Sequence, residues 1–194
     1  MSFLIILKRF KQLLNFPYRR SCGGEIKSTD FKQGLNARCV FNRDFYLIET
    51  FSGYRMLGAD PQGSYYLLSP DVDDEQLGMA VLDALFKSRI IPLEEIDDFF
   101  EPEKCDEQYK EWIDELIKTY GYRSKRQLFK RMRDCGIQLL DGNITIRPTG
   151  HEKLELWTGK GMVESDDVVI PADSSPAEVG AALRLAFSRC RSYV

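Results

Sequence analysis

The clearest hydrophobic pattern in the chain is a strand followed by a capped helix near its C-terminal end. The β-branched run 168–170 stops at Pro171, which is typical of a buried strand. Ser175, Pro176 and Glu178 then form the signature of a helix N-terminus, where side-chain oxygens satisfy free backbone N–H groups. Apolar residues follow at helical spacing: Val179, Ala182, Leu183, Ala186 and Phe187. We predict a strand and a core helix here.

A similar unit occurs earlier in the chain. Aligning Gly78 with Gly180 places Tyr66-Leu67-Leu68 over the strand, and Asp73 with Gln76 over the capping residues. The apolar stripe of this earlier helix consists of Ala80, Val81, Ala84 and Leu85. Two interpretations stay open, a structural repeat or the similarity that all capped helices share.

The middle of the chain alternates between predicted strands and helices. Aromatic and β-branched residues from Val40 to Tyr66, broken by a turn at 60–63, predict antiparallel strands. An acidic stretch at 93–103 has apolar residues at the spacing of a short helix. The strongest amphipathic pattern ends at Gly121, a helix terminator, and consists of Tyr109, Trp112, Ile113, Leu116, Ile117 and Tyr120.

The remaining pattern predicts a basic helix and then more strands. A helix opens at Ser124 and closes near Gly136, a hairpin covers 137–148, and alternation suggests a strand over 151–157. We predict a single α+β domain, with a largely antiparallel or mixed β-sheet and helices packed on it. Residues 1–39 are expected to form a loosely ordered or peripheral N-terminal arm, and residues 40–194 the domain.

Composition agrees with a globular protein and narrows its chemistry. Hydrophobic residues make up 43% and charged residues 29% of the chain, which argues against disorder. The net charge of −3 excludes a generally basic nucleic-acid coat but not a local basic patch. Five cysteines without Cys-x-x-Cys spacing favour reduced thiols and a cytoplasmic location. The apolar run after Met1 is too short for a membrane span and lacks the preceding basic residues of an export signal, so an arm or a weak membrane or partner contact remains.

Two charged surfaces are candidate interaction sites. Acidic residues gather before the first helix and in the 93–103 stretch, where they form either solvated faces or a docking surface for a basic partner. The basic helix at 123–133, interleaved with aromatic residues, suits nucleic acid, although a solvated face paired with acidic neighbours explains it as well.

Catalytic chemistry has little support in the sequence. His151 is the only histidine and lies beside no nucleophile signature, so we expect it to be structural. The chain has no glycine-rich phosphate loop and no metal-binding motif, and we expect neither cofactor nor metal. A binding module, for protein or for nucleic acid, is therefore expected rather than an enzyme.

A family resemblance favours the protein-binding interpretation. From Asn42 to Cys190 the chain resembles contact-dependent growth inhibition immunity proteins of the CdiI type. The matching segments are 44–50, Leu77-Gly78 with Ala84-Leu85 and Ser88-Arg89, Tyr120-Gly121-Tyr122 with Leu128-Phe129-Lys130, His151 with Leu154-Glu155 and Trp157, and 178–180 with 187–190.

The resemblance implies a cytoplasmic antitoxin that binds the C-terminal toxin domain of a CdiA-like effector in a one-to-one complex. Such toxins are often nucleases, and tRNA is a frequent target. An acidic protein can cover the positive cleft of a nuclease. From charge we expect toxin contacts at Asp71, Asp73, Asp74, Glu94, Glu95, Asp97, Asp98 and Glu101, with no direct nucleic-acid contact. The alternative is that the basic helix at 123–133 binds RNA or DNA.

Overall fold

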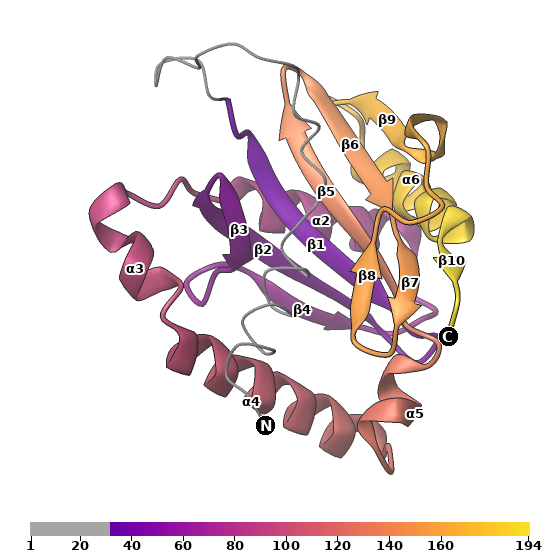
Figure 1. The fold of residues 1–194 in the computed structure, drawn as a ribbon. Coiled ribbons are helices and arrows are strands. Elements are labelled where there is room, and N and C mark those ends of the chain that lie inside the picture. Colours follow the sequence, from indigo (N-terminus) through magenta and orange to yellow (C-terminus); the bar gives the residue numbers. More distant parts are fainter. Residues whose placement is uncertain (1–31) are drawn as a thin grey trace.

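The structure is a computed structural model that describes residues 32–194, so residues 1–31 of the predicted arm lie outside the described residues. Figure 1 shows a twisted central sheet with helices around it. The elements in chain order are β1 (Leu35–Phe41), β2 (Tyr46–Tyr54), β3 (Met56–Ala59), β4 (Tyr65–Leu68), α2 (Asp74–Phe86), the 3-10 helix η1 (Leu93–Glu95), α3 (Ile96–Phe99), α4 (Pro102–Tyr120), α5 (Lys125–Phe129), β5 (Arg133–Leu140), β6 (Asn143–Pro148), β7 (Gly150–Lys153), β8 (Leu156–Thr158), the 3-10 helix η2 (Glu164–Asp166), β9 (Val168–Pro171), α6 (Pro176–Arg189) and β10 (Arg191–Ser192).

The main sheet is antiparallel throughout. Its strand order is β3-β2-β1-β5-β6-β9, and β4 pairs with the first half of β2. A small sheet, β10-β7-β8, contains one parallel pair, β10 with β7. This architecture confirms the predicted α+β class. Because β1 begins at Leu35, residues 35 to 39 belong to the sheet and not to the N-terminal arm.

The two faces of the sheet are buried under different helices. Successive side chains of a strand point to opposite faces, so neighbours in β1 and β2 enter different cores. Cys39 and Ile48 pack toward α2 and α6 in the first core. Val40 and Leu47 pack toward α4, α5 and β8 in the second core. Both faces are therefore covered by other elements, which explains why apolar residues occur on both sides of β1 and β2.

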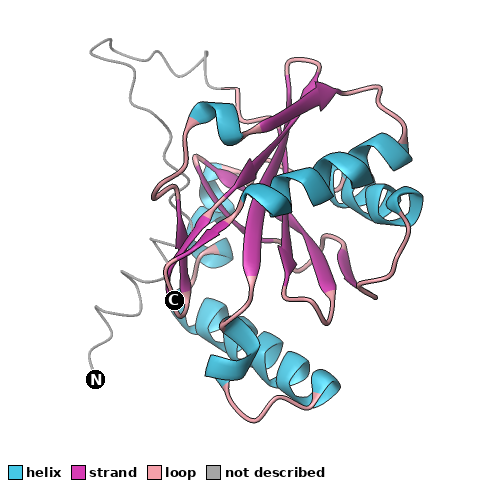
Figure 2. Ribbon diagram, turned by 90° about the vertical axis from the view of Figure 1, so that its right-hand side faces the viewer, coloured by secondary structure: helices cyan, strands magenta, loops and turns pink. Residues whose placement is uncertain are grey.

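The helices α2 and α6 lie side by side on one face (Figure 2) and pack through the two aligned glycines. A Cβ on Gly78 would lie 1.8 Å from the carbonyl oxygen of Pro176, and one on Gly180 would lie 2.0 Å from that of Asp74. Each glycine thus packs on the residue four positions before the other. The edge strands β4 and β9 pair antiparallel with β2 and β6 in the same way, so the structure supports the repeat interpretation.

Two predicted boundaries were wrong. The basic helix ends at Phe129 rather than near Gly136, because Arg133 already pairs with Phe41 in the sheet. The predicted strand 151–157 is a hairpin of β7 and β8 with a turn between them. The ring of His151 stacks on Trp157 at a centroid distance of 4.5 Å and bonds the carbonyl of Leu154, which fixes this turn.

Candidate binding site

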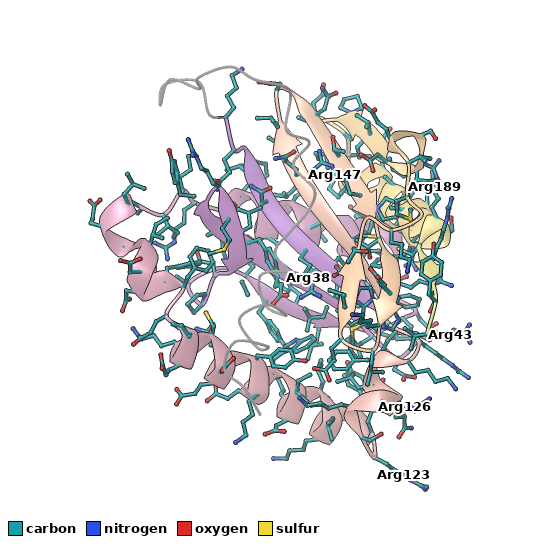
Figure 3. All side chains as sticks on the ribbon, viewed as in Figure 1. Arg38, Arg43, Arg123, Arg126, Arg147 and Arg189 are labelled. Atoms are coloured by element: carbon teal, nitrogen blue, oxygen red, sulfur yellow. The ribbon has the colours of Figure 1, made fainter. Side chains whose placement is uncertain are left out.

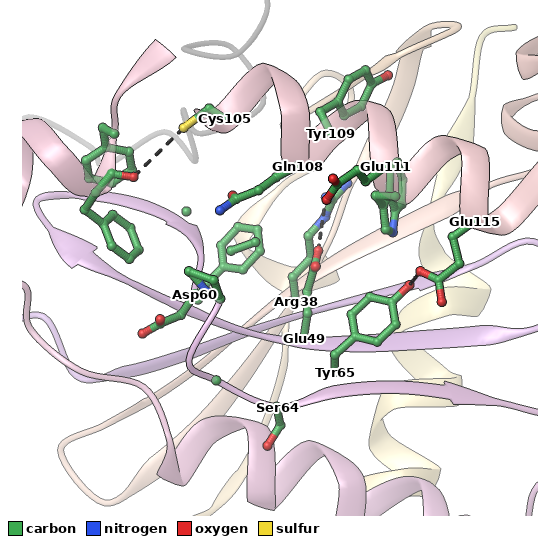
Figure 4. A pocket seen from close by; sticks show the side chains of 18 of the residues that line it. Arg38, Glu49, Asp60, Ser64, Tyr65, Cys105, Gln108, Tyr109, Glu111 and Glu115 are labelled. Atoms are coloured by element: carbon green, nitrogen blue, oxygen red, sulfur yellow. Dashed lines mark hydrogen bonds and ion pairs between the residues drawn. The ribbon is translucent and has the colours of Figure 1, made fainter. Parts of the chain in front are cut away.

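A cavity of about 610 Å³ lies between the sheet and α4 (Figure 4), on the face opposite α2 and α6. Its floor comes from β1, β2, β3 and the turn leading to β4, and its opposite wall comes from α3 and α4. This volume falls in the range of small-molecule and peptide side-chain sites. Aromatic rings cover much of the wall: Phe51, Tyr65, Phe99, Phe100, Tyr109, Trp112, Phe129 and Trp157.

The amphipathic pattern of α4 positions the helical wall. Pro102 occupies the first turn, and Gly121 ends the helix in the left-handed conformation with φ of 67°. Ile113 and Leu116 are buried in the second core and hold the helix on the sheet. Residues three and four positions apart share a helix face, so Trp112 and Glu115 are turned toward the cavity together.

An ion-pair cluster forms the floor of the cavity. Arg38 on β1 binds Asp134 on β5 through Nε and Nη2, at 3.1 and 2.9 Å, and reaches Glu49 on β2 at 3.5 Å. The three side chains are 16%, 12% and 8% exposed for Arg38, Glu49 and Asp134. Two carboxylates share one guanidinium, so the cluster carries a net negative charge.

The pKa values in this cluster follow from burial and mutual attraction. Burial alone would lower the pKa of Arg38, but the carboxylates of Asp134 and Glu49 outweigh it and raise that pKa above its usual value. Burial raises the pKa of Glu49, and Arg38 only partly opposes this shift. Arg38 therefore stays charged.

The rim adds carboxylates without matching cations. Glu111, Glu115 and Glu155 line the cavity, and no lysine or arginine of residues 32–194 forms an ion pair with them. Tyr65 donates to Glu115 at 2.9 Å, and Tyr109 donates to Glu155 at 2.6 Å. Burial, followed by the bond to Glu115, raises the pKa of Tyr65, which keeps the phenol protonated as a donor.

A further carboxylate and one indole also belong to the polar lining. Asp60 is bound by Arg89 at 2.7 Å and has a fully buried side chain, so it supports the floor and is not available to a ligand. The indole Nε1 of Trp112 is buried and has no hydrogen-bond partner among the described residues. Counting the partners in residues 32–194 only, the cavity offers one unused donor, three carboxylates without a cation and aromatic faces, a combination that suits a guanidinium or ammonium group.

His151 takes no part in this site. It is 1% exposed, and burial lowers the pKa of its imidazole. Its Nε2 contacts the Leu154 carbonyl at 3.1 Å, in agreement with the structural role predicted for it. Within residues 32–194 no group of three or more His, Cys, Asp or Glu side chains is placed to hold a metal ion. The four described cysteines, Cys39, Cys105, Cys135 and Cys190, are free thiols.

The structure separates the eight acidic residues predicted as one contact surface. Asp71, Asp73 and Asp74 lie at the N-terminus of α2, which is about 20 Å long. Two of them have local roles, because Asp73 caps the amide of Gln76 at 2.7 Å and Asp74 binds Arg184 at 2.6 Å.

The other five lie beyond the opposite end of α2, next to the cavity. Glu94 and Glu95 are exposed in η1, and Asp97 and Asp98 are exposed in α3. Asp98 and Glu101 both pair with Lys104. This group flanks Phe99 and Phe100, which line the cavity, so it forms one edge of the same acidic surface.

The cavity itself was not predicted from the sequence. The carboxylates of α4 lie beside its apolar stripe in the helical pattern, so their spacing could have predicted an acidic edge along this helix. In contrast, the partners of Arg38 are 11 and 96 residues away in the chain and come together only when β1 pairs with β2 and β5. No local pattern reports such a contact.

These features define a class of protein: a preformed, aromatic, acid-rimmed cavity suits a binding protein with a basic partner. The chain belongs to the CDI immunity protein family, CdiI, whose family model matches residues 35–190. The described helices contain none that is long and apolar enough to cross a membrane.

Known proteins resemble the chain over most of its length. It is 46% identical to immunity protein CdiI-YPIII of Yersinia pseudotuberculosis serotype O:3 (strain YPIII), over 84% of this chain and 98% of that protein. A chain in a CdiA-CT/CdiI toxin and immunity complex from Yersinia pseudotuberculosis is 42% identical, with a TM-score of 0.76 over 84% of this chain and all of that chain. The protein of unknown function NMB0488 from Neisseria meningitidis is 37% identical, with a TM-score of 0.76 over 85% of this chain and all of that chain.

Proposed function

We propose that this protein is a cytoplasmic immunity protein that binds the C-terminal toxin domain of a CdiA-like effector one-to-one and blocks it, with no catalysis of its own. Membership in the CdiI family supports this role, as does the toxin complex in which a relative was solved. The observation that carries the proposal is the acid-rimmed cavity, whose three rim carboxylates form no ion pair with a cation of residues 32–194.

The charge of the cavity supports a nuclease as the partner, acting on tRNA or another RNA. A nuclease must attract phosphates and therefore presents cations around its active site. Carboxylates on the immunity protein can pair with those cations in place of the substrate, which both accelerates association and selects the partner. A basic side chain entering the cavity would meet Glu111, Glu115 and the ring of Trp112 together.

The contact surface proposed here combines the cavity rim with the acidic edge formed by η1 and α3. Glu94, Glu95, Asp97, Asp98 and Glu101 extend the negative potential from the cavity mouth outward. Exposed charges of this kind mainly set the association rate, whereas those buried in the complex set its lifetime. Asp71, Asp73 and Asp74, at the far end of α2, are left outside this contact.

The first test is a titration of the purified protein with the toxin domain encoded next to it. Replacing Glu111, Glu115 and Glu155 by glutamine should raise the Kd by at least about tenfold, since each buried, charged contact contributes well over the 1.4 kcal/mol that a tenfold change represents. The matched control replaces Glu103, Glu107 and Asp114 by their amides, on the opposite side of α4, with the same change in net charge. Equal affinities for the two triple variants would refute the cavity as the contact.

A second variant examines the acidic edge. Reversing Glu94, Glu95, Asp97 and Asp98 to lysine should lower the association rate more than it raises the dissociation rate. The partner's chemistry is tested by incubating the free toxin with total RNA and adding this protein. Intact tRNA at every toxin concentration, with toxicity retained in cells, would reject the nuclease part of the proposal and leave the binding part standing.

A further inference from the structure

A strongly basic surface lies at the end of α4, outside the proposed toxin site. Residues 123–133 contain six basic and no acidic side chains. Arg133 is half-buried and donates to the carbonyl of Phe187 at 3.1 Å, so it is structural. Arg123, Arg126, Lys130 and Arg131 are exposed, and none of them forms an ion pair with a carboxylate of residues 32–194. Within residues 32–194 this basic face is therefore solvated, as expected for one interpretation, and has no acidic partner.

Arg43, eighty residues earlier, joins the same surface (Figure 3). The turn between β1 and β2 is tied to α5 on both sides of Arg43. Asn42 donates to the hydroxyl of Tyr122 at 2.8 Å and to the carbonyl of Leu128 at 3.4 Å, and Tyr122 donates to Asp44. These bonds hold the turn against α5 and leave Arg43 exposed between its two anchored neighbours.

The backbone at Arg43 is in the left-handed region, with φ of 80°. Glycine or asparagine adopts this conformation readily, whereas arginine is disfavoured there. Among the described residues, Arg43 forms no ion pair that would explain its presence. An unfavourable residue with an exposed, unpaired charge points to a role for that charge outside the fold.

We propose that this basic patch, defined as Arg43, Arg123, Arg126, Lys130 and Arg131, binds the phosphate backbone of nucleic acid. Four of its five cations are arginines, whose planar forks match phosphate oxygens in a bidentate manner. The neighbouring aromatic side chain, Tyr122, is half-buried with its hydroxyl engaged, so the patch offers phosphate contacts without a platform for stacking bases. Binding is therefore independent of base sequence and strongly dependent on salt.

This inference goes beyond toxin binding and does not depend on it. The net charge of −3 left a local basic patch open, and the charges of the chain are indeed segregated. Within α4 six acidic residues outnumber three basic ones, and the basic patch begins just after its C-terminal end. No residue of the basic patch lines the cavity, so the patch can be tested on the isolated protein.

The test measures anisotropy of a fluorescein-labelled duplex DNA and a labelled RNA hairpin titrated with the protein. Five phosphate contacts predict that log K falls with log salt concentration with a slope of about −4. Arg126→Gln with Lys130→Gln should weaken binding by at least tenfold and reduce the slope by about 2. The control, Lys32→Gln with Lys87→Gln, removes the same charge from exposed sites away from the patch and should leave both quantities nearly unchanged.

The variant Arg43→Gly tests the binding role of the Arg43 charge separately from its effect on stability. It removes one phosphate contact and relieves the left-handed backbone, so nucleic-acid affinity should fall while Tm rises or stays the same. Three results would overturn the proposal: absence of binding at about 50 mM salt, an equal loss in the control variant, or displacement of the DNA by poly-glutamate at equal charge concentration. The last result would assign the patch to an acidic protein partner instead.

Discussion

The packing of α2 against α6 makes a sharp prediction for Gly78→Ala. In an ordinary helix interior, replacing glycine by alanine is favourable by about 1 kcal/mol. Here the added methyl carbon would lie 1.8 Å from the carbonyl oxygen of Pro176, far inside any contact distance. That oxygen belongs to the backbone of α6 and cannot rotate away, so the two helices must separate by more than about 1 Å.

The expected loss follows from what these helices bury. Leu77, Val81 and Leu85 of α2, with Leu183 and Phe187 of α6, sit in the first core with almost no exposed area. A gap of about 1 Å removes between a quarter and a half of the dispersion energy at each contact it opens. Overpacking of this kind costs about 1–3 kcal/mol or more. After the gain of about 1 kcal/mol in helix propensity, we expect a net loss of up to about 2 kcal/mol, equivalent to roughly 4–8 °C in Tm for a domain of this size.

Urea and thermal unfolding followed by circular dichroism give the measurement. Ala181→Gly, at an exposed position in the interior of α6, is the matched control: it should lose only the propensity difference of about 1 kcal/mol. Gly180→Ala should resemble Gly78→Ala, and the double variant should lose less than the sum, because one helix displacement relieves both contacts. A Gly78→Ala protein as stable as the wild type would show that the close helix approach does not constrain the fold.

Two further predictions concern buried titratable groups. Arg38→Met leaves Glu49 and Asp134 buried without their cation, so we expect a loss of about 3–5 kcal/mol in urea unfolding, part of which Glu49→Gln in the same background should restore. Burial lowers the pKa of His151 in the folded protein, so the unfolded chain binds this proton more readily. The contribution of the neutral imidazole to the free energy of unfolding is therefore fully present above the unfolded pKa of about 6.5. It is lost as the pH falls through the folded pKa. His151→Gln should flatten the dependence of the unfolding free energy on pH in that window, and an unchanged slope would contradict this assignment because the chain has no other histidine.

The sequence was most informative where local chemistry and burial agree. The cap at Ser175, the glycine after Tyr120 and the stripe beginning at Val179 each act within one helix, and the structure has these helix ends where they were predicted. The boundary between α5 and β5 was missed because Met132 continues the helical stripe by spacing, although it packs into the second core. There the pairing of β5 with β1 overrides local preference.

The candidate site depends even more on tertiary contacts that local sequence patterns do not predict. Charge alone grouped the N-terminus of α2 with the acidic edge at α3, although a whole helix lies between them. The cavity depends on where α4 crosses the sheet, which is decided by tertiary packing. Arg43 could be recognised only from its backbone angle, since nothing in the segment Asn42-Arg43-Asp44 predicts a left-handed arginine.

The two strand-and-helix units differ in one respect that bears on how such a protein can diverge. Whereas residues 190–194 after the second unit supply β10, residues 93–132 follow the first unit and supply α3, α4 and α5. They contribute both the wall of the cavity and most of the basic patch, while the paired helices on the other face hold the scaffold together. The proposed partner contacts therefore fall mainly in this one segment, where surface residues can change without altering the close glycine contact between α2 and α6.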